Sequence, residues 1–260
     1  MYISKKETYK KYGITFNNGK ILSPIGYICE LLKEGNEKTG KLVLTFSLLP
    51  GTGIFSANIN NKTYTVKGTC ACDCKGCYAK TGHYRQTSAV RSMVINTYLV
   101  NNYIDFVKNC IQAQLDYYGQ GELRIHAAGD FNTQDPESYA AMWYDIAKNN
   151  KSFLFWTYTK VKKYETLFDS LDNANIVKSI IPGIGVNYGT CEYVINAYYT
   201  LKSLNQSVYI CRCGVDKMQH CQGCKVCATY KYVLFIEHST GYKAEKDPLF
   251  TKLCAIIDNQ

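Results

Sequence analysis

The chain has 260 residues, of which 46% are hydrophobic, so it can bury a core without disulfide cross-links. Its 30 Lys and Arg residues against 21 Asp and Glu give a net charge of +9, which favours anionic partners such as nucleic acid or phosphorylated ligands. No segment approaches the ~18 apolar residues of a membrane span, and residues 1–7 lead into polar sequence with no apolar signal core. We therefore expect a cytoplasmic protein with no membrane partner.

Hydrophobic periodicity predicts strands alternating with helices along most of the chain. Residues 42–47 alternate as a strand, a short strand is expected at 64–67, and Ser88 is expected to cap a helix that ends near residue 99. A helix over 104–115 follows, with an apolar face at 3-4-4 spacing. Beyond it we expect strands at 123–127, 153–158, 176–186 (interrupted by Pro182 and Gly183), 208–211 and 232–236, and helices at 136–148 (capped by Asp135), 160–171 and 191–204.

This alternation predicts an α/β fold in which helices cover a mostly parallel sheet, either a partial TIM-like barrel or a doubly wound sheet. We adopt the partial barrel. Residues 1–60 are expected to form an N-terminal extension packed on the core, and residues 61–210 the α/β partial barrel. Residues 211–260 are expected to form a Cys-rich, metal-binding insertion and C-terminal segment within the same structural domain.

Cysteines are concentrated in two short stretches. Four of the ten residues from Thr69 to Tyr78 are cysteines, and the chain has thirteen in all. Because they cluster at metal-like spacings in a chain with no export signal, we interpret them as metal ligands rather than disulfide partners. The first group comprises Cys70, Cys72, Cys74 and Cys77.

Without Cys72 the first group has the spacing C-x3-C-x2-C, which resembles the motif of radical S-adenosylmethionine (SAM) enzymes. The resemblance implies that Cys70, Cys74 and Cys77 bind three irons of a 4Fe–4S cluster and leave the fourth open to SAM. It also implies a position after the first barrel strand, and an electron donor such as flavodoxin or ferredoxin. If Cys72 is a fourth ligand, the site is instead closed and structural.

A second partial match follows the strand 123–127, which ends in Ala128-Gly129-Asp130. This resembles the Gly-Gly-Glu that often contacts the SAM amino group in these enzymes, although a strand-to-helix turn explains it equally well. The residue before the last cysteine, often aromatic in the superfamily, is Gly76, and Tyr78 follows the cysteine. We therefore take Gly129, Asp130 and Tyr78 as candidate cofactor-binding residues.

A closer resemblance covers most of residues 42–227 and is to the phage and plasmid "gene product 88" family. It implies an architecture and a mobile-element origin more than it implies a reaction. The residues that carry it are Leu48-Leu49-Pro50-Gly51, Cys74-Lys75-Gly76-Cys77-Tyr78-Ala79, Arg91, Asn96, Arg124-Ile125-His126-Ala127-Ala128-Gly129-Asp130-Phe131, Tyr158-Thr159-Lys160 and the late cysteines.

The late cysteines predict a second metal site. Cys221, Cys224 and Cys227 are spaced C-x2-C-x2-C, and Cys211 or Cys213 can supply a fourth thiolate. An iron–sulfur cluster would resemble the auxiliary clusters of radical SAM enzymes, whereas zinc would make a structural knuckle. We favour iron–sulfur because the even spacing is similar to ferredoxin-type runs.

Two functional hypotheses follow. The first is a radical SAM-like enzyme acting on an unknown substrate that is anionic or related to nucleic acid, because six basic residues face only Asp73 between residues 62 and 91. The alternative is a non-catalytic nucleic-acid-binding protein held together by zinc or a closed iron–sulfur cluster, with some of its 23 tyrosines as stacking platforms. His126 is expected to be hydrogen-bonded in place rather than to shuttle protons.

Overall fold

The computed structural model describes residues 4–35, 40, 42–72, 77, 79, 82–212, 215, 221–237 and 243–260. The predictions made for Cys74, Tyr78 and Cys213 lie outside these residues. None of the described helices is long and apolar enough to cross a membrane.

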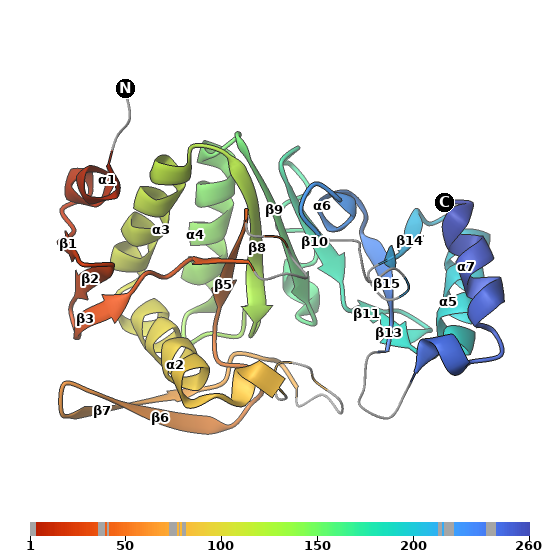
Figure 1. Ribbon diagram of the computed structural model, residues 1–260, viewed down its shortest axis with the longest axis horizontal. Coiled ribbons are helices and arrows are strands. Elements are labelled where there is room, and N and C mark those ends of the chain that lie inside the picture. The colour runs from red at the N-terminus through yellow and green to blue at the C-terminus, as the bar shows by residue number, and fades with distance from the viewer. Residues whose placement is uncertain are drawn as a thin grey trace.

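The core of the molecule is an open sheet of five strands (Figure 1). Four of them run parallel and cross the sheet in chain order, and a short antiparallel strand lies at one edge. From one edge to the other the strands are β10 (Ala174–Lys178), β9 (Phe153–Thr159), β8 (Gly121–Ala128), β5 (Val43–Ser47) and β4 (Lys33–Glu34).

Helices cover one face of this sheet. α3 (Ile104–Tyr118) and α4 (Pro136–Asn149) pack side by side against it, and α2 (Thr87–Asn102) lies beside β5 near the carboxyl ends of the parallel strands (Figure 1). The predicted cap of α4 is confirmed, since the Asp135 side chain accepts a hydrogen bond from the Ser138 amide. Leu123, Phe155 and Ile176 on the strands pack into the same buried cluster as Val107 of α3.

The mixed α/β fold is confirmed. The strand order does not reverse, so the sheet is not doubly wound, and repeated right-handed crossovers in one direction put the helices on one face. The described strands do not close into a barrel, and the partial TIM-like barrel stays a prediction. The proposed domain limits also stay a prediction, although β5, within residues 1–60, is an interior strand of the sheet.

Two predicted elements are wrong. Residues 160–171 form only the single turn η3 (Lys162–Tyr164) and further tight turns, in which the amides of Leu167, Asp169 and Leu171 bond to carbonyls three residues earlier. Ser88 does not cap α2, which begins at Thr87 after Gln86. The strand expected at 64–67 exists as β7 (Lys62–Lys67) but pairs only with β6 (Ile54–Ile59), in a hairpin that packs on α2.

A second hydrophobic cluster lies toward the C-terminus, beyond β10 (Figure 1). It is built around a small parallel sheet in the order β13 (Tyr188–Gly189), β15 (Tyr232–Ile236) and β14 (Val208–Ile210), covered by α5 (Cys191–Ser203) and α7 (Phe250–Asp258). The remaining elements are α1 (Lys5–Lys11), β1 (Phe16–Asn17), β2 (Lys20–Ser23), β3 (Gly26–Cys29), η2 (Gly82–Arg85), β11 (Ile180–Ile181), β12 (Gly185–Val186), α6 (Val226–Thr229) and η5 (Ala244–Lys246).

Candidate metal centres

The first cysteine segment returns from the β6–β7 hairpin to the carboxyl edge of the central sheet. There it runs alongside the segment that leaves β5. The Thr69 amide donates to the Leu49 carbonyl at 2.9 Å, and the Cys70 amide donates to the Gly51 carbonyl at 3.1 Å. The backbone of Cys70 is therefore fixed at the edge where the four parallel strands end, which is where sites collect in α/β folds.

The Gly129–Asp130 turn at the end of β8 closes on the same segment from the other side. The Asp130 amide donates to the Thr69 hydroxyl at 3.0 Å, and the Asn132 amide to the Thr69 carbonyl at 3.0 Å. Gly129 has a φ of +84°, and a Cβ there would lie 2.7 Å from the Thr69 hydroxyl oxygen and from Leu48 Cβ. Only glycine fits this conformation and this close approach.

The Asp130 carboxylate joins β8 to the end of β9. It is 4% exposed, and it accepts hydrogen bonds from the Phe131 amide (2.8 Å), the Thr159 hydroxyl (2.7 Å) and the Lys160 amide (2.9 Å). Burial raises the pKa of this carboxyl, and the hydrogen bonds oppose that shift. Asp130 therefore holds two strand ends together beside Cys70, while its predicted contact with SAM stays a prediction.

The described thiols of the first group differ in exposure. Burial raises the pKa of Cys70 to about 12; a hydrogen bond with the Gly51 backbone opposes the shift, and the nearby Asp130 and Cys77 groups add to it. Cys70 and Cys77 are both half-buried, whereas Cys72 is exposed. Two of the three predicted open-site ligands are thus half-buried, Cys72 lies at the surface, and their common cluster stays a prediction.

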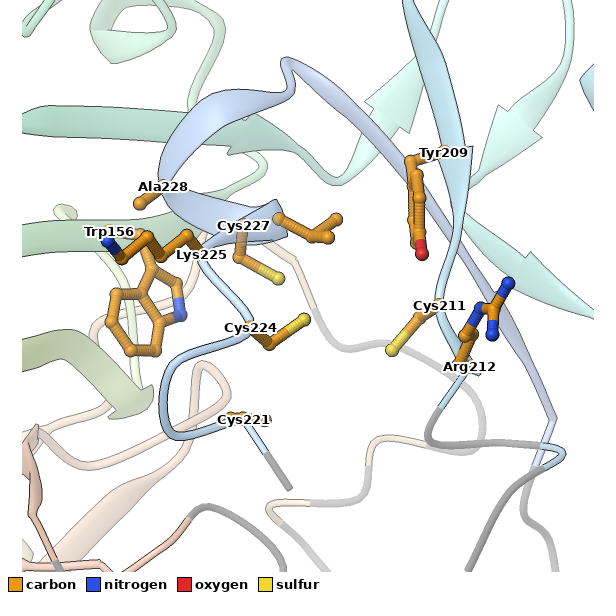
Figure 2. A pocket seen from close by; sticks show the side chains of 10 residues that line it. Trp156, Tyr209, Cys211, Arg212, Cys221, Cys224, Lys225, Cys227 and Ala228 are labelled. Carbon is orange, nitrogen blue, oxygen red and sulfur yellow. The ribbon is translucent and has the colours of Figure 1, made fainter. Parts of the chain in front are cut away.

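The second cysteine group surrounds one small cavity of about 30 Å³ (Figure 2). The sulfur atoms of Cys211, Cys224 and Cys227 point toward the space between the end of β14 and the loop that leads into α6. The cavity lining contains no carboxylate and no imidazole; its members are Trp156, Tyr209, Cys211, Arg212, Cys221, Cys224, Lys225, Val226, Cys227 and Ala228.

Polar residues of the central sheet bind this group on the face opposite α3 and α4. The Tyr158 hydroxyl donates to Cys227 Sγ at 3.0 Å, and the Arg124 guanidinium lies 4.9 Å from the centre of the Tyr158 ring. The Asn175 side chain donates to the Cys227 and Tyr230 carbonyls, each at 2.9 Å. The sequence predicted the thiols but not these partners, whose signal in the sequence is only their alternation with the helix-facing residues of each strand.

The thiols suit a soft metal, but they are not arranged around one. Within the described ranges, no group of three or more His, Cys, Asp or Glu side chains is placed to hold a metal ion. Four thiols without a carboxylate or imidazole are a donor set of structural zinc sites and of iron–sulfur clusters. Burial also raises the pKa of Cys227 to about 12, an effect that the hydrogen bond from Tyr158 opposes.

His126 is part of the scaffold. Its ring nitrogens lie 3.0 Å from the Thr157 hydroxyl and 2.7 Å from the Tyr139 hydroxyl, and its side chain is buried. Burial, and then the positive charge of Arg124, lower the pKa of His126 to about 3, so the ring is neutral at pH 7. The expectation that His126 is hydrogen-bonded in place is confirmed.

The segment that forms the first site lies within a match to a known family. A family profile described as Gene product 88 matches residues 30–181, more than half of the chain. The chain belongs to the gene product 88 family. Neither a curated protein nor a solved structure matches it. The gene product 88 segment contains the whole central sheet and the first cysteine group, and it ends before the second group.

Proposed function

We propose that this gene product 88 protein is an iron–sulfur enzyme of the radical SAM type, with its cluster on Cys70, Cys74 and Cys77. One observation carries the proposal: Cys70 is fixed at the carboxyl edge of a parallel sheet by the ends of β5 and β8, next to the Gly129–Asp130 turn. Loop positions at this edge are where α/β enzymes assemble their sites.

The available donors fit such a cluster. Cys70 and Cys77 are both half-buried thiols, and a three-thiolate set leaves one iron open for SAM. When bound, the cluster supplies an electron that cleaves SAM and starts radical chemistry. The chain's own part is to hold Cys70 through Thr69 and to shield the site by packing the hairpin against α2.

The substrate would be anionic. Lys62 and Lys67 of β7, Arg85 of η2 and Arg91 of α2 are all exposed, and these three elements pack together beside the cysteine segment. A cluster of exposed cations raises the local concentration of a phosphate-bearing molecule. An acidic electron donor such as flavodoxin or ferredoxin would be attracted by the same charge.

Anaerobic reconstitution tests the enzyme hypothesis. We expect iron and sulfide in near-equal amounts, a reduced-state EPR signal that changes on adding SAM, and loss of that signal in Cys70→Ser. Cys29→Ser, which alters an exposed lone thiol on β3, is the control. Cys72→Ser should keep the SAM-responsive signal if the site is open. A cluster signal indifferent to SAM would refute the radical SAM assignment, and loss of the cluster in Cys72→Ser would identify a closed site.

The alternative is a nucleic-acid-binding protein without catalysis, which the same exposed cations favour. It predicts that affinity for single-stranded DNA or RNA falls steeply as salt rises, because bound counterions are released. The tyrosines add little to this hypothesis: Tyr139 is fully buried and Tyr144 is half-buried, whereas Tyr199 is 51% exposed. Absence of salt-dependent binding in a fluorescence-anisotropy titration would remove this alternative.

A further inference from the structure

We propose that Cys211, Cys221, Cys224 and Cys227 form a tetrathiolate site for a soft metal, either zinc or an iron–sulfur cluster, which fastens the C-terminal sheet to the central sheet. The four thiols line one cavity, and no carboxylate or imidazole lines it (Figure 2). This site is separate from the first cysteine group, so it stands independently of the proposed enzyme activity.

Cys211 belongs to the C-terminal sheet. It directly follows β14, and its amide donates to the Leu234 carbonyl of β15 at 2.8 Å. Both strands contribute to the second hydrophobic cluster, through Ile210 and Leu234. The position of Cys211 is thus set by the C-terminal core, which makes it the fourth ligand that the described residues offer.

The other three thiols are positioned by the central sheet. The Gly223 amide, between Cys221 and Cys224, donates to Glu122 Oε1 of β8 at 2.9 Å. At the other end of the run, Asn175 of β10 binds the Cys227 carbonyl at 2.9 Å. A metal bound by all four thiols would therefore link the two hydrophobic cores. The C-x2-C-x2-C spacing alone did not predict this link.

Metal binding would draw these thiols inward. Neutral thiols have no electrostatic reason to gather at one point, whereas thiolates are drawn to a bound cation. Binding of the metal and ordering of the site therefore occur together. The four cysteines lie in two short segments, one bonded to β15 through Cys211 and the other to β8 and β10 through Gly223 and Cys227. This attachment limits the closing movement to side chains and the loop before α6.

Tyr158 is a positioning residue of this site. Its hydroxyl donates to Cys227 Sγ at 3.0 Å, and the Arg124 guanidinium lies against its ring. A hydrogen bond to a ligating thiolate fixes the orientation of the sulfur and withdraws charge from it, and loss of such a partner lowers metal affinity by about 10–100-fold. Because the ring is also packed, Tyr158→Phe removes the hydroxyl with the least change in shape.

The test is metal analysis of the full chain purified without oxygen, by mass spectrometry of zinc and iron and by sulfide assay. Cys211→Ser and Cys224→Ser should each lose about one metal centre per chain, whereas Cys254→Ser, a lone half-buried thiol on α7, should lose none. Cys70→Ser should also keep this centre, which separates the site from the first one. Zinc without sulfide identifies a zinc site, and iron with sulfide identifies a cluster. Unchanged metal content in both Cys211→Ser and Cys224→Ser would overturn the proposal.

Two measurements keep the proposal testable if a serine variant fails to fold. Tyr158→Phe should fold, bind metal about 10–100-fold more weakly, and shift the thiolate-to-metal charge-transfer bands after cobalt substitution or cluster reconstitution. Removing the metal from the unaltered protein should speed amide exchange in β14 and α6 by about tenfold or more, because the link between the cores opens. Unaltered bands and unaltered exchange would show that no metal joins the two sheets.

Discussion

Replacement of Asp130 by alanine should destabilise the protein strongly, because this carboxylate joins the carboxyl ends of β8 and β9. Its two oxygens accept three hydrogen bonds within 2.9 Å, two from main-chain amides and one from the Thr159 hydroxyl. Alanine leaves all three donors buried without that acceptor. Asp130 is itself 4% exposed, so water cannot easily replace the lost oxygens.

The magnitude follows from these three bonds. Leaving a buried donor unsatisfied costs about 1–3 kcal/mol, which gives an upper range of about 3–9 kcal/mol for three. Part of this is offset, because the raised pKa of Asp130 shows that burying the carboxylate is itself unfavourable. We therefore expect a loss of about 3–5 kcal/mol in the free energy of unfolding, and a fall of about 10 °C in Tm.

Urea denaturation followed by circular dichroism measures this loss. Asp145→Ala is the matched control: its carboxylate pairs with Lys108 at 2.8 Å but is 50% exposed, so its loss should cost less than about 1 kcal/mol. The loss in the free energy of unfolding for Asp130→Asn should lie between those of the two alanine variants, because asparagine keeps one acceptor oxygen but places its side-chain NH2 group against a donor. A cost below about 1 kcal/mol for Asp130→Ala would refute the structural role and favour a role in ligand binding.

Three further substitutions test other buried contacts of the central sheet. Gly129→Ala should cost about 2–4 kcal/mol, because its Cβ would lie 2.7 Å from two neighbouring atoms, whereas Gly119→Ala, also at positive φ but in open space, should cost about 1 kcal/mol in a parallel urea titration. The buried His126 ring stays neutral in the folded state because its pKa is lowered to about 3, whereas in the unfolded chain it is protonated below about pH 6.5. Its contribution to the free energy of unfolding is therefore complete above pH 6.5 and is lost as pH falls toward 3. At pH 5 this loss is about 2 kcal/mol. Asparagine tolerates the φ of +56° at this position, so His126→Asn should make the urea midpoint depend less on pH between pH 4 and 6.5. An unchanged dependence of the midpoint on pH would contradict this. Asn173→Ala should cost about 2 kcal/mol in thermal denaturation, because the Asn173 side-chain amide donates to three main-chain carbonyls, and an unshifted Tm would contradict that role.

The sequence by itself determined the local elements and the chemistry of the donors. Strand and helix periodicity predicted β8, β9 and the apolar face of α3, and Asp135 before Pro136 predicted the start of α4, because these signals depend on neighbours in the chain. The family resemblance is likewise confirmed by the profile match. Cysteine spacing could name soft-metal ligands, since residue type alone sets the preference for such metals.

Tertiary structure alone decided which residues meet. The 160–171 segment has apolar residues at helical spacing, yet it forms tight turns, and the amide of Lys160 at its start is bound by Asp130, thirty residues earlier. Likewise, β7 precedes the cysteines in sequence but pairs away from the central sheet, and Cys211 faces the C-x2-C-x2-C run only because β14 and β10 belong to adjoining sheets. Contacts of this kind join groups that are far apart in the chain, so no local pattern encodes them.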